Sequence, residues 1–185
     1  LLLLVLGVAL MLRLYGVGWD SGHGFHPDER SLYMQSDCMY RLLSQDSEYG
    51  DCIRDYPDTV PGFPSIDVFF DKERSPLNPH WFPLGSVLLY IMVFFRFVIE
   101  PFTDISVLEM SYVGRPLSAL ADVGVVLMVY LLGKNIYGWK IGLLGAALVA
   151  LSVINIQNSH YYRPETIITL VVLVSYYLMA RMLDR

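Results

Sequence analysis

The chain has 185 residues, of which 55% are hydrophobic and only 17% are charged, and its apolar residues are gathered in long blocks. This composition is typical of a membrane protein. The formal net charge is −5 and no basic stripe interleaved with aromatic residues occurs, so we do not expect nucleic acid as a partner. Because the sequence starts and stops in or beside hydrophobic runs, we treat it as a fragment of a longer protein, with a natural short protein as the alternative.

The first block, LLLLVLGVALMLRLYGVGW, predicts a membrane-spanning helix over residues 1–18. It is a little short of the roughly 20 residues that a span requires, but flanking aromatic residues can complete it. A secretory signal peptide is the alternative, since such peptides have short apolar cores. We favour the helix because no clear A-x-A-like cleavage site follows and further apolar blocks come later.

Residues 19–115 form a long connection that is acidic and rich in proline. From Asp20 to His80 it carries twelve Asp or Glu residues against five Lys or Arg residues. A helix is predicted to begin at Asp28 and to run through ERSLYMQSDCMYRLLS, with Leu32, Met39, Tyr40 and Leu43 roughly on one face, as in a helix that rests on the bilayer.

The block WFPLGSVLLYIMVFFRFVIEP near the end of this connection has two interpretations. Residues 84–98 are apolar enough to cross the membrane, or they form an interfacial helix that lies on its surface. We prefer the surface helix, because Arg96 would be costly in lipid. This choice keeps the whole of residues 19–115 on one side of the membrane.

Three further apolar blocks predict spans over residues 116–133, 141–157 and 166–182. Lys134 and Lys140 lie in the turn between the first two of these, Arg181 lies at the end of the last, and Arg185 follows it. The positive-inside rule places these basic residues in the cytoplasm. The sequence therefore predicts an all-α polytopic membrane protein with about four transmembrane helices and a large extracytoplasmic first loop with surface-lying helices.

Three polar clusters then fall on the extracytoplasmic side: HPDER after the first span, GRPLSALAD entering the second, and SHYYRPET between the third and fourth. A carboxylate at such a place can take a proton from a hydroxyl group. An arginine can hold a phosphate through its planar fork of donors. The combination suits a reaction in which a hydroxyl attacks and an anionic group leaves.

These motifs resemble the GT-C superfamily of membrane glycosyltransferases, specifically its protein O-mannosyltransferase-like and aminoarabinose-transferase-like group. HPDE looks like the His/Phe-x-Asp-Glu signature after the first helix, and NPHWFPLGSVLLYIM is similar to the segment that contains His-Pro-Pro-Leu in the first outer loop. The run from YVGRPLSALAD to YYRPETIITL resembles the block in which an arginine opens the second helix and Arg-Pro-Asp/Glu opens the fourth.

The resemblance implies an enzyme that transfers a sugar from a polyprenyl phosphate to an extracytoplasmic hydroxyl acceptor, with inversion. It makes Asp28 the base and Glu29 its neighbouring acid. Arg115, and Arg163 with Glu165, would hold the lipid phosphate. No metal or other cofactor is implied. The acceptor would be a protein, a lipid or a glycan, and the membrane would be the bacterial plasma membrane or that of the endoplasmic reticulum.

Each of these residues also has a structural interpretation. Asp28 could be only a helix N-cap, and Glu29 could simply favour the positive end of the helix dipole. Arg115 could be an interfacial anchor whose side chain snorkels. Arg163 and Glu165 could be loop charges at a turn.

A zinc site is the alternative for His23, His26 and Asp28, since histidine and carboxylate are zinc ligands, but their spacing is not a strong motif. We interpret His80 and His160 as interfacial or hydrogen-bonded side chains. The aromatic residues in HYY, WF and GW are interpreted as interface belts in preference to a sugar platform.

Three more residues are singled out by their surroundings. Asp122 lies inside a predicted span, where an acid usually faces the bundle interior and finds a partner, so structural pairing and function are both open. Cys38 and Cys52 lie in the outer loop, where an oxidising compartment permits a disulfide. Two free thiols are the alternative.

Two functions of other classes compete with the glycosyltransferase. One is a non-catalytic membrane scaffold or accessory subunit of a larger complex, derived from such an enzyme. The other is a transporter or flippase-like protein, which would move lipid-linked substrates without breaking the sugar–phosphate bond.

Overall fold

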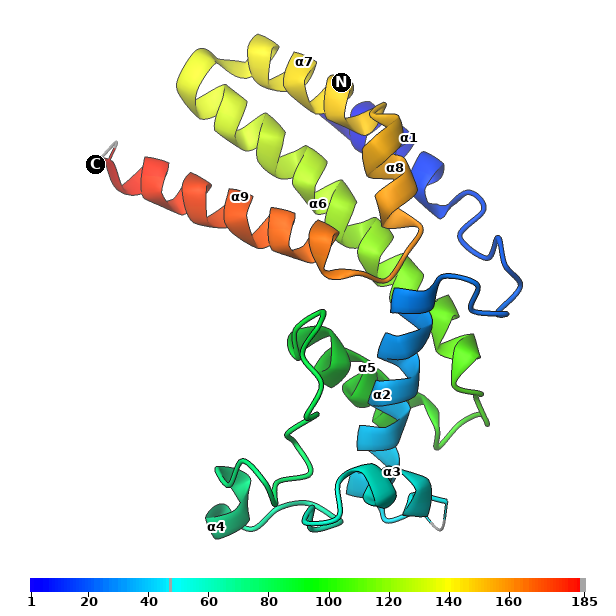
Figure 1. The fold of residues 1–185 in the computed structure, drawn as a ribbon. Coiled ribbons are helices and arrows are strands. Elements are labelled where there is room, and N and C mark those ends of the chain that lie inside the picture. The colour runs from blue at the N-terminus through cyan, green and yellow to red at the C-terminus, as the bar shows by residue number, and fades with distance from the viewer. Residues whose placement is uncertain (47, 184–185) are drawn as a thin grey trace. The chain divides into compact units, whose positions relative to one another are not determined.

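The computed structural model describes residues 1–46 and 48–183, and this part of the chain is helical with no strand (Figure 1). Its elements are α1 (Leu2–Leu14), α2 (Pro27–Ser44), α3 (Gly50–Asp55), α4 (Ile66–Phe69), α5 (Val87–Ile99), the 3₁₀ turn η1 (Leu108–Met110), α6 (Ser111–Tyr137), α7 (Trp139–Ala150), α8 (Val153–Ser159) and α9 (Pro164–Leu183). The chain divides into two compact units. The membrane unit combines residues 1–21 with the part from Ser111 onward, and the loop unit is Gly22–Met110.

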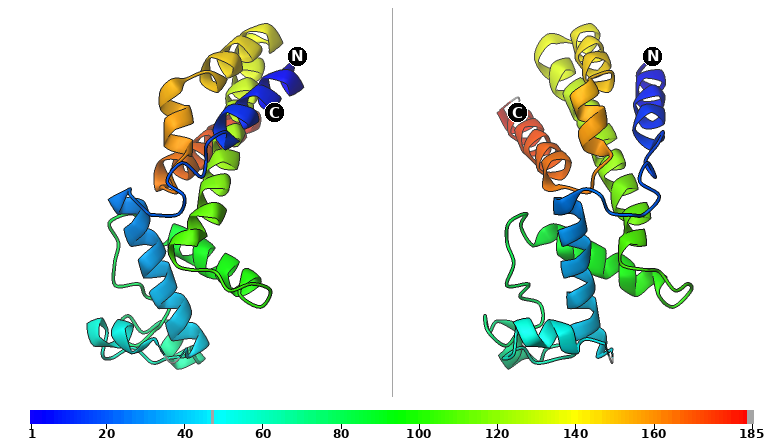
Figure 2. Two further views of the ribbon diagram at one scale, coloured as in Figure 1. Left: turned by 90° about the vertical axis from the view of Figure 1, so that its right-hand side faces the viewer. Right: turned by 45° about the vertical axis from the view of Figure 1, so that its right-hand side comes forward.

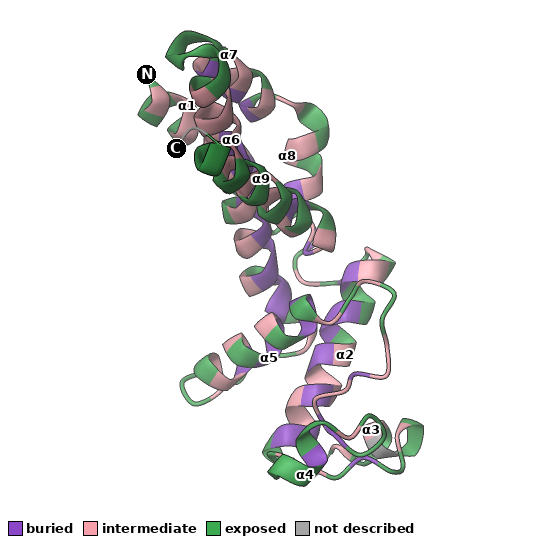
Figure 3. Cartoon of the chain, turned by 90° about the vertical axis from the view of Figure 1, so that its left-hand side faces the viewer, coloured by how far each residue is buried: buried purple, intermediate pink, exposed green. Residues whose placement is uncertain are grey.

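Two helical segments, which lie wholly or almost wholly in the membrane unit, are long and apolar enough to cross a membrane. One is Leu108–Tyr137 with 30 residues, which contains the predicted span 116–133, and the other is Pro164–Leu183 with 20 residues, which contains 166–182. Helix α6 runs beside α7 and α9 in both views of Figure 2. Nearly all of α9 is exposed or half-buried, as lipid-facing helices are (Figure 3).

The other two predicted spans differ from continuous membrane helices. Within residues 1–18 the helix covers only Leu2–Leu14, which is 13 residues. At the predicted span 141–157, α7 and α8 are bent by 60° at a short break, a geometry that fits either one broken span or a re-entrant loop. By length and composition, the described residues therefore supply two spans, or three with the bent pair.

Helices α6 and α7 approach each other closely because each has a glycine at the crossing. A Cβ atom added to Gly133 would lie 2.7 Å from the Cα atom of Gly142. One added to Gly142 would lie 2.6 Å from both the Lys134 nitrogen and the Tyr130 oxygen. Small residues at such crossings let helix backbones pack in direct contact inside membranes.

Replacing Gly142 by Ala should therefore push α6 and α7 apart. The added methyl group meets backbone atoms, which cannot rotate away, so we expect a destabilisation of about 1–3 kcal/mol. Thermal unfolding in detergent, followed by circular dichroism, measures the effect. The matched control is Gly7→Ala in α1, where an added Cβ meets nothing within 4 Å. Equal stability of the two variants would show that the crossing is not tightly packed.

The loop unit is built on α2 and α5. The predicted helix from Asp28 is present as α2. Leu32, Met39 and Leu43 of its predicted apolar face are buried inside the unit and Tyr40 is half-buried, whereas the sequence had suggested that this face rests on the bilayer. Met39 and Leu43 pack against Val93 of α5. The buried and exposed positions of α5 alternate with the helical period, although almost every one of them is apolar.

Arg96, the charged residue of α5, faces the protein. Its guanidinium lies 2.6 Å from a carboxylate oxygen of Asp37 on α2 and 3.2 Å from one of Glu100. It also lies over the ring of Tyr40, 5.0 Å from the ring centre. Burial and the neighbouring Glu100 carboxylate raise the pKa of Tyr40. Arg96, whose cost in lipid was the reason to prefer a surface helix, is thus paired with acids of the loop unit.

Candidate functional site

Arg115 stands in the first turns of α6 and is only 1% exposed. Its two terminal nitrogens donate to the two carboxylate oxygens of Asp20, over 2.6 Å and 2.8 Å, and one also donates to the Val17 carbonyl over 3.2 Å. Its guanidinium lies 5.2 Å from the ring centre of Trp19. Arg115 therefore fastens the start of α6 to the segment that follows α1, and its fork of donors already holds a carboxylate.

Asp20 was not among the predicted site residues. It is 3% exposed and stands 95 positions before Arg115, so no local pattern marks the pair. The physical signal was that an arginine at the head of a membrane helix needs a counter-charge when it is buried. Asp20 is the acid that lies nearest in sequence to the end of the first apolar block.

Arg163 and Glu165, which the sequence placed in one motif, form an ion pair. A terminal nitrogen of Arg163 lies 2.5 Å from a carboxylate oxygen of Glu165, and their side chains are 29% and 46% exposed. Pro164 is the first residue of α9, a position that proline favours, and Glu165 lies in the first turn, where the helix dipole favours an acid. Arg163 is thus the more accessible of the two predicted phosphate-binding arginines.

Asp28 and Glu29 lie in the first turn of α2. The N-cap of this helix is His26, whose ring nitrogen Nδ1 accepts from the Glu29 main-chain N–H over 3.5 Å. The interpretation of Asp28 as the N-cap is therefore wrong: Pro27 takes the first helical position, so the residue before it becomes the cap. Asp28 is half-buried, whereas Glu29 is fully buried and accepts from the Tyr33 hydroxyl over 3.0 Å.

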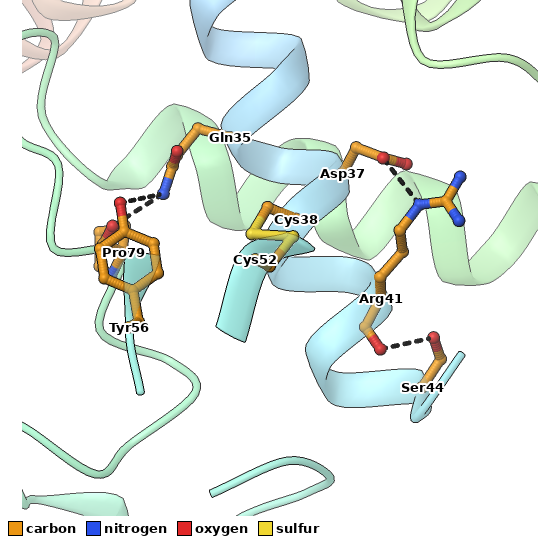
Figure 4. Close-up of a disulfide and its surroundings, with 8 residues drawn as sticks. All are labelled: Gln35, Asp37, Cys38, Arg41, Ser44, Cys52, Tyr56 and Pro79. Carbon is orange, nitrogen blue, oxygen red and sulfur yellow. Dashed lines mark hydrogen bonds and ion pairs between the residues drawn. A yellow bond between two sulfur atoms is a disulfide. The ribbon is translucent and has the colours of Figure 1, made fainter. Parts of the chain in front are cut away.

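Cys38 and Cys52 are joined by a disulfide between α2 and α3, with their Cα atoms 5.7 Å apart (Figure 4). Beside it, the Arg41 guanidinium donates to Asp37 over 2.8 Å, and this hydrogen bond raises the pKa of Arg41. The Asp37 carboxylate therefore forms ion pairs with both Arg41 and Arg96. The disulfide and these ion pairs fix the carboxyl-terminal half of α2, whereas the HPDE motif lies at its amino-terminal end.

Asp122 faces the interior of the membrane unit and has a partner there, as was expected of an acid in a span. Nε of Arg13 in α1 donates to it over 2.5 Å. The two terminal nitrogens of Arg13 donate to the carbonyl of Ala150 over 3.0 Å and to that of Val149 over 3.2 Å. Arg13 thus binds the last carbonyls of α7, where α7 and α8 break.

The candidate zinc ligands His23, His26 and Asp28 do not form a group that could hold a metal ion. Among the residues that the structure describes, no group of three or more His, Cys, Asp or Glu side chains could hold a metal ion. The His23 ring stacks on Phe25 at 5.5 Å, and the His80 ring stacks on Tyr56 at 4.8 Å. Each ring nitrogen of His160 lies within hydrogen-bond distance of a main-chain carbonyl oxygen, that of Ile156 or that of Tyr15.

The predicted site residues are divided between the two units. Asp28 and Glu29 belong to the loop unit, and Arg115, Arg163 and Glu165 belong to the membrane unit. Of these, Arg163 and Glu165 form an ion pair with each other, and Arg115 is paired with Asp20, which had not been predicted. Comparisons of the chain with protein-family models, with curated proteins and with solved structures found no match.

Proposed function

We propose that the chain is the amino-terminal part of a GT-C-type membrane glycosyltransferase that moves a sugar from a polyprenyl phosphate to a hydroxyl group. The observation that carries the proposal is the order of three motifs along the chain. HPDE opens α2, GRP lies in the first turns of α6, and RPE opens α9. Helix starts are places where polar side chains can be held firmly beside a membrane surface.

The chemistry is a single displacement with inversion. Asp28 takes the proton of the acceptor hydroxyl, whose oxygen forms a bond to the anomeric carbon. The bond from that carbon to the phosphate oxygen breaks, and the polyprenyl phosphate leaves with the electron pair. Arginine stabilises the phosphate as its charge grows. Arg163 is half-buried and paired with Glu165, and Arg115 is buried and paired with Asp20, so each arginine exchanges a carboxylate for the phosphate.

The membrane setting of the proposal follows from charge and helix length. In this proposal Lys134 and Lys140 lie on the cytoplasmic side, so the motifs HPDE, GRP and RPE lie on the extracytoplasmic side. The membrane is the plasma membrane of a bacterium or that of the endoplasmic reticulum. Helix α5 has 13 residues and is about 20 Å long, shorter than the hydrocarbon core of ~30 Å, which favours a position along the surface. A disulfide between Cys38 and Cys52 suits an extracytoplasmic loop.

A second candidate function is a non-catalytic scaffold or accessory subunit derived from such an enzyme. The buried pair of Arg115 and Asp20 favours it, because a phosphate-binding arginine that is neutralised by its own chain has become a structural residue. Such a subunit would keep the fold and its membrane position and would contribute contacts to other membrane subunits.

Sugar transfer in isolated membranes tests the proposal. Membranes that contain the full gene product are given radiolabelled polyprenyl-phosphate sugars, and label in the protein, lipid and glycan fractions is counted. We expect label to move from the donor to one acceptor fraction, and the movement to stop without the gene product. Absence of transfer, together with stable co-purification of other membrane proteins, would support the scaffold.

A further inference from the structure

The membrane unit has a cleft between the segment that follows α1 and helix α8. Its volume is about 310 Å³, and it is lined by Tyr15, Gly16, Trp19, Gln157, His160 and Tyr161. Three of these six residues are aromatic, and Gln157 adds an amide that is exposed. Ligand pockets commonly combine aromatic walls with a few polar groups, and this volume is at the lower end of their range, which fits one small ring.

The cleft is held together by contacts between its two sides. The ring of Trp19 meets that of Tyr161 edge to face, with their centres 5.8 Å apart. The ring nitrogens of His160 lie 2.6 Å from the carbonyl oxygen of Ile156 in α8 and 2.7 Å from that of Tyr15. His160 therefore ties the end of α1 to the end of α8 and fixes the position of Tyr15.

The exposed walls of the cleft suit a sugar ring better than a purely apolar ligand. Tyr15 is 83% exposed and Trp19 is 45% exposed, so aromatic surface is open to a ligand. A pyranose has one face made mostly of C–H bonds, which can lie on an aromatic ring, and a rim of hydroxyl groups. The Gln157 amide offers both a donor and an acceptor to such hydroxyls.

We propose that this cleft binds the sugar ring of a glycosyl substrate, with Tyr15 and Trp19 as the aromatic surface and Gln157 as the hydrogen-bonding group. The inference rests on the proposed transferase function, to which it adds a sugar subsite. The sequence suggested interface belts for the aromatic residues of HYY and GW, but residues about 140 positions apart meet in one cleft. His160 is a positioning residue in this subsite.

Tryptophan fluorescence tests the proposal on the full gene product. Exchanging Trp81 and Trp139 for Phe leaves Trp19 as the one tryptophan of residues 1–185. Any tryptophan elsewhere in the gene product is exchanged as well. The protein is kept in lauryl dimethylamine oxide, because sugar-based detergents would compete. Methyl α-mannopyranoside and methyl β-glucopyranoside are titrated separately, with glycerol as the control for added hydroxyl groups.

We expect a saturable change in Trp19 fluorescence with at least one of the two glycosides and none with glycerol. Gln157→Leu should raise the midpoint about three-fold or more, the usual effect of one lost hydrogen bond, and Tyr15→Ala should raise it as well. The matched control is Tyr137→Ala, an aromatic residue that is 69% exposed at the other end of α6. It should leave the midpoint unchanged.

Three results would overturn the subsite: a Trp19 fluorescence change that never saturates, one that is equally large with glycerol, or one that Tyr15→Ala and Gln157→Leu do not alter. The aromatic cluster would then be a membrane-interface anchor. The same variants separate this result from a failure of the proposed function. Glycoside binding without sugar transfer would retain the subsite and reject the transferase. Sugar transfer with an unchanged KM for the donor and acceptor in Gln157→Leu would retain the transferase and reject the subsite.

Discussion

Replacing Asp28 by Asn is expected to reduce sugar transfer by roughly a hundredfold to ten-thousandfold, which is the usual contribution of a general base. Asparagine keeps the size and shape of the side chain but cannot take the proton of the acceptor hydroxyl. The change should leave α2 intact, because the N-cap of this helix is His26. The initial rate of label transfer from the polyprenyl-phosphate sugar measures the effect.

Two comparisons make this result specific to the base. Asp58→Asn is the matched control, since Asp58 is an exposed acid of the same unit and its exchange should change neither rate nor stability. Thermal unfolding of Asp28→Asn should match that of the natural protein within experimental error. Full transfer activity in Asp28→Asn would remove the base assignment, and a loss of activity that runs parallel to a loss of stability would make Asp28 a structural residue.

The helices whose signals are local could be predicted from the sequence. Helix α2 has apolar residues at helical spacing and a proline at its start, and α6 and α9 contain long, mostly apolar runs. These patterns depend on residues within a few turns of one another. The break between α7 and α8 could not be predicted, because its Ala150 carbonyl is bound by Arg13, which lies 137 positions away.

The candidate site shows the same division. The neighbours Arg163 and Glu165 were placed in one motif and they form an ion pair. The partner of Arg115 was missed, because Asp20 is brought to it by the packing of the whole unit. The interpretation of Asp28 as the N-cap was wrong by two residues. Pro27 takes the first helical position, so the cap is His26. Long-range pairing and exact helix starts are therefore what the sequence alone leaves open.

The second large effect is expected from Arg13. Exchanging it for methionine leaves the buried Asp122 without its counter-charge, which typically costs about 3–5 kcal/mol when one partner of a buried pair is removed. It also removes the donor to the Ala150 carbonyl at the end of α7. We expect a large fall in the thermal unfolding temperature in detergent, whereas Arg54→Met, which removes an exposed ion pair, should have little effect.

A double exchange separates the two tasks of Arg13. In Arg13→Met with Asp122→Leu neither charge of this pair remains, so the double variant should be more stable than Arg13→Met alone. It should still be less stable than the natural protein, because the Ala150 carbonyl has lost its donor, and a buried polar group without a partner costs about 1–3 kcal/mol. A double variant as stable as the natural protein would mean that the charge pair alone matters. If Arg13→Met alone were as stable as the natural protein, Arg13 would not join α1, α6 and α7. The packing of the membrane unit would then rest on its apolar and glycine contacts.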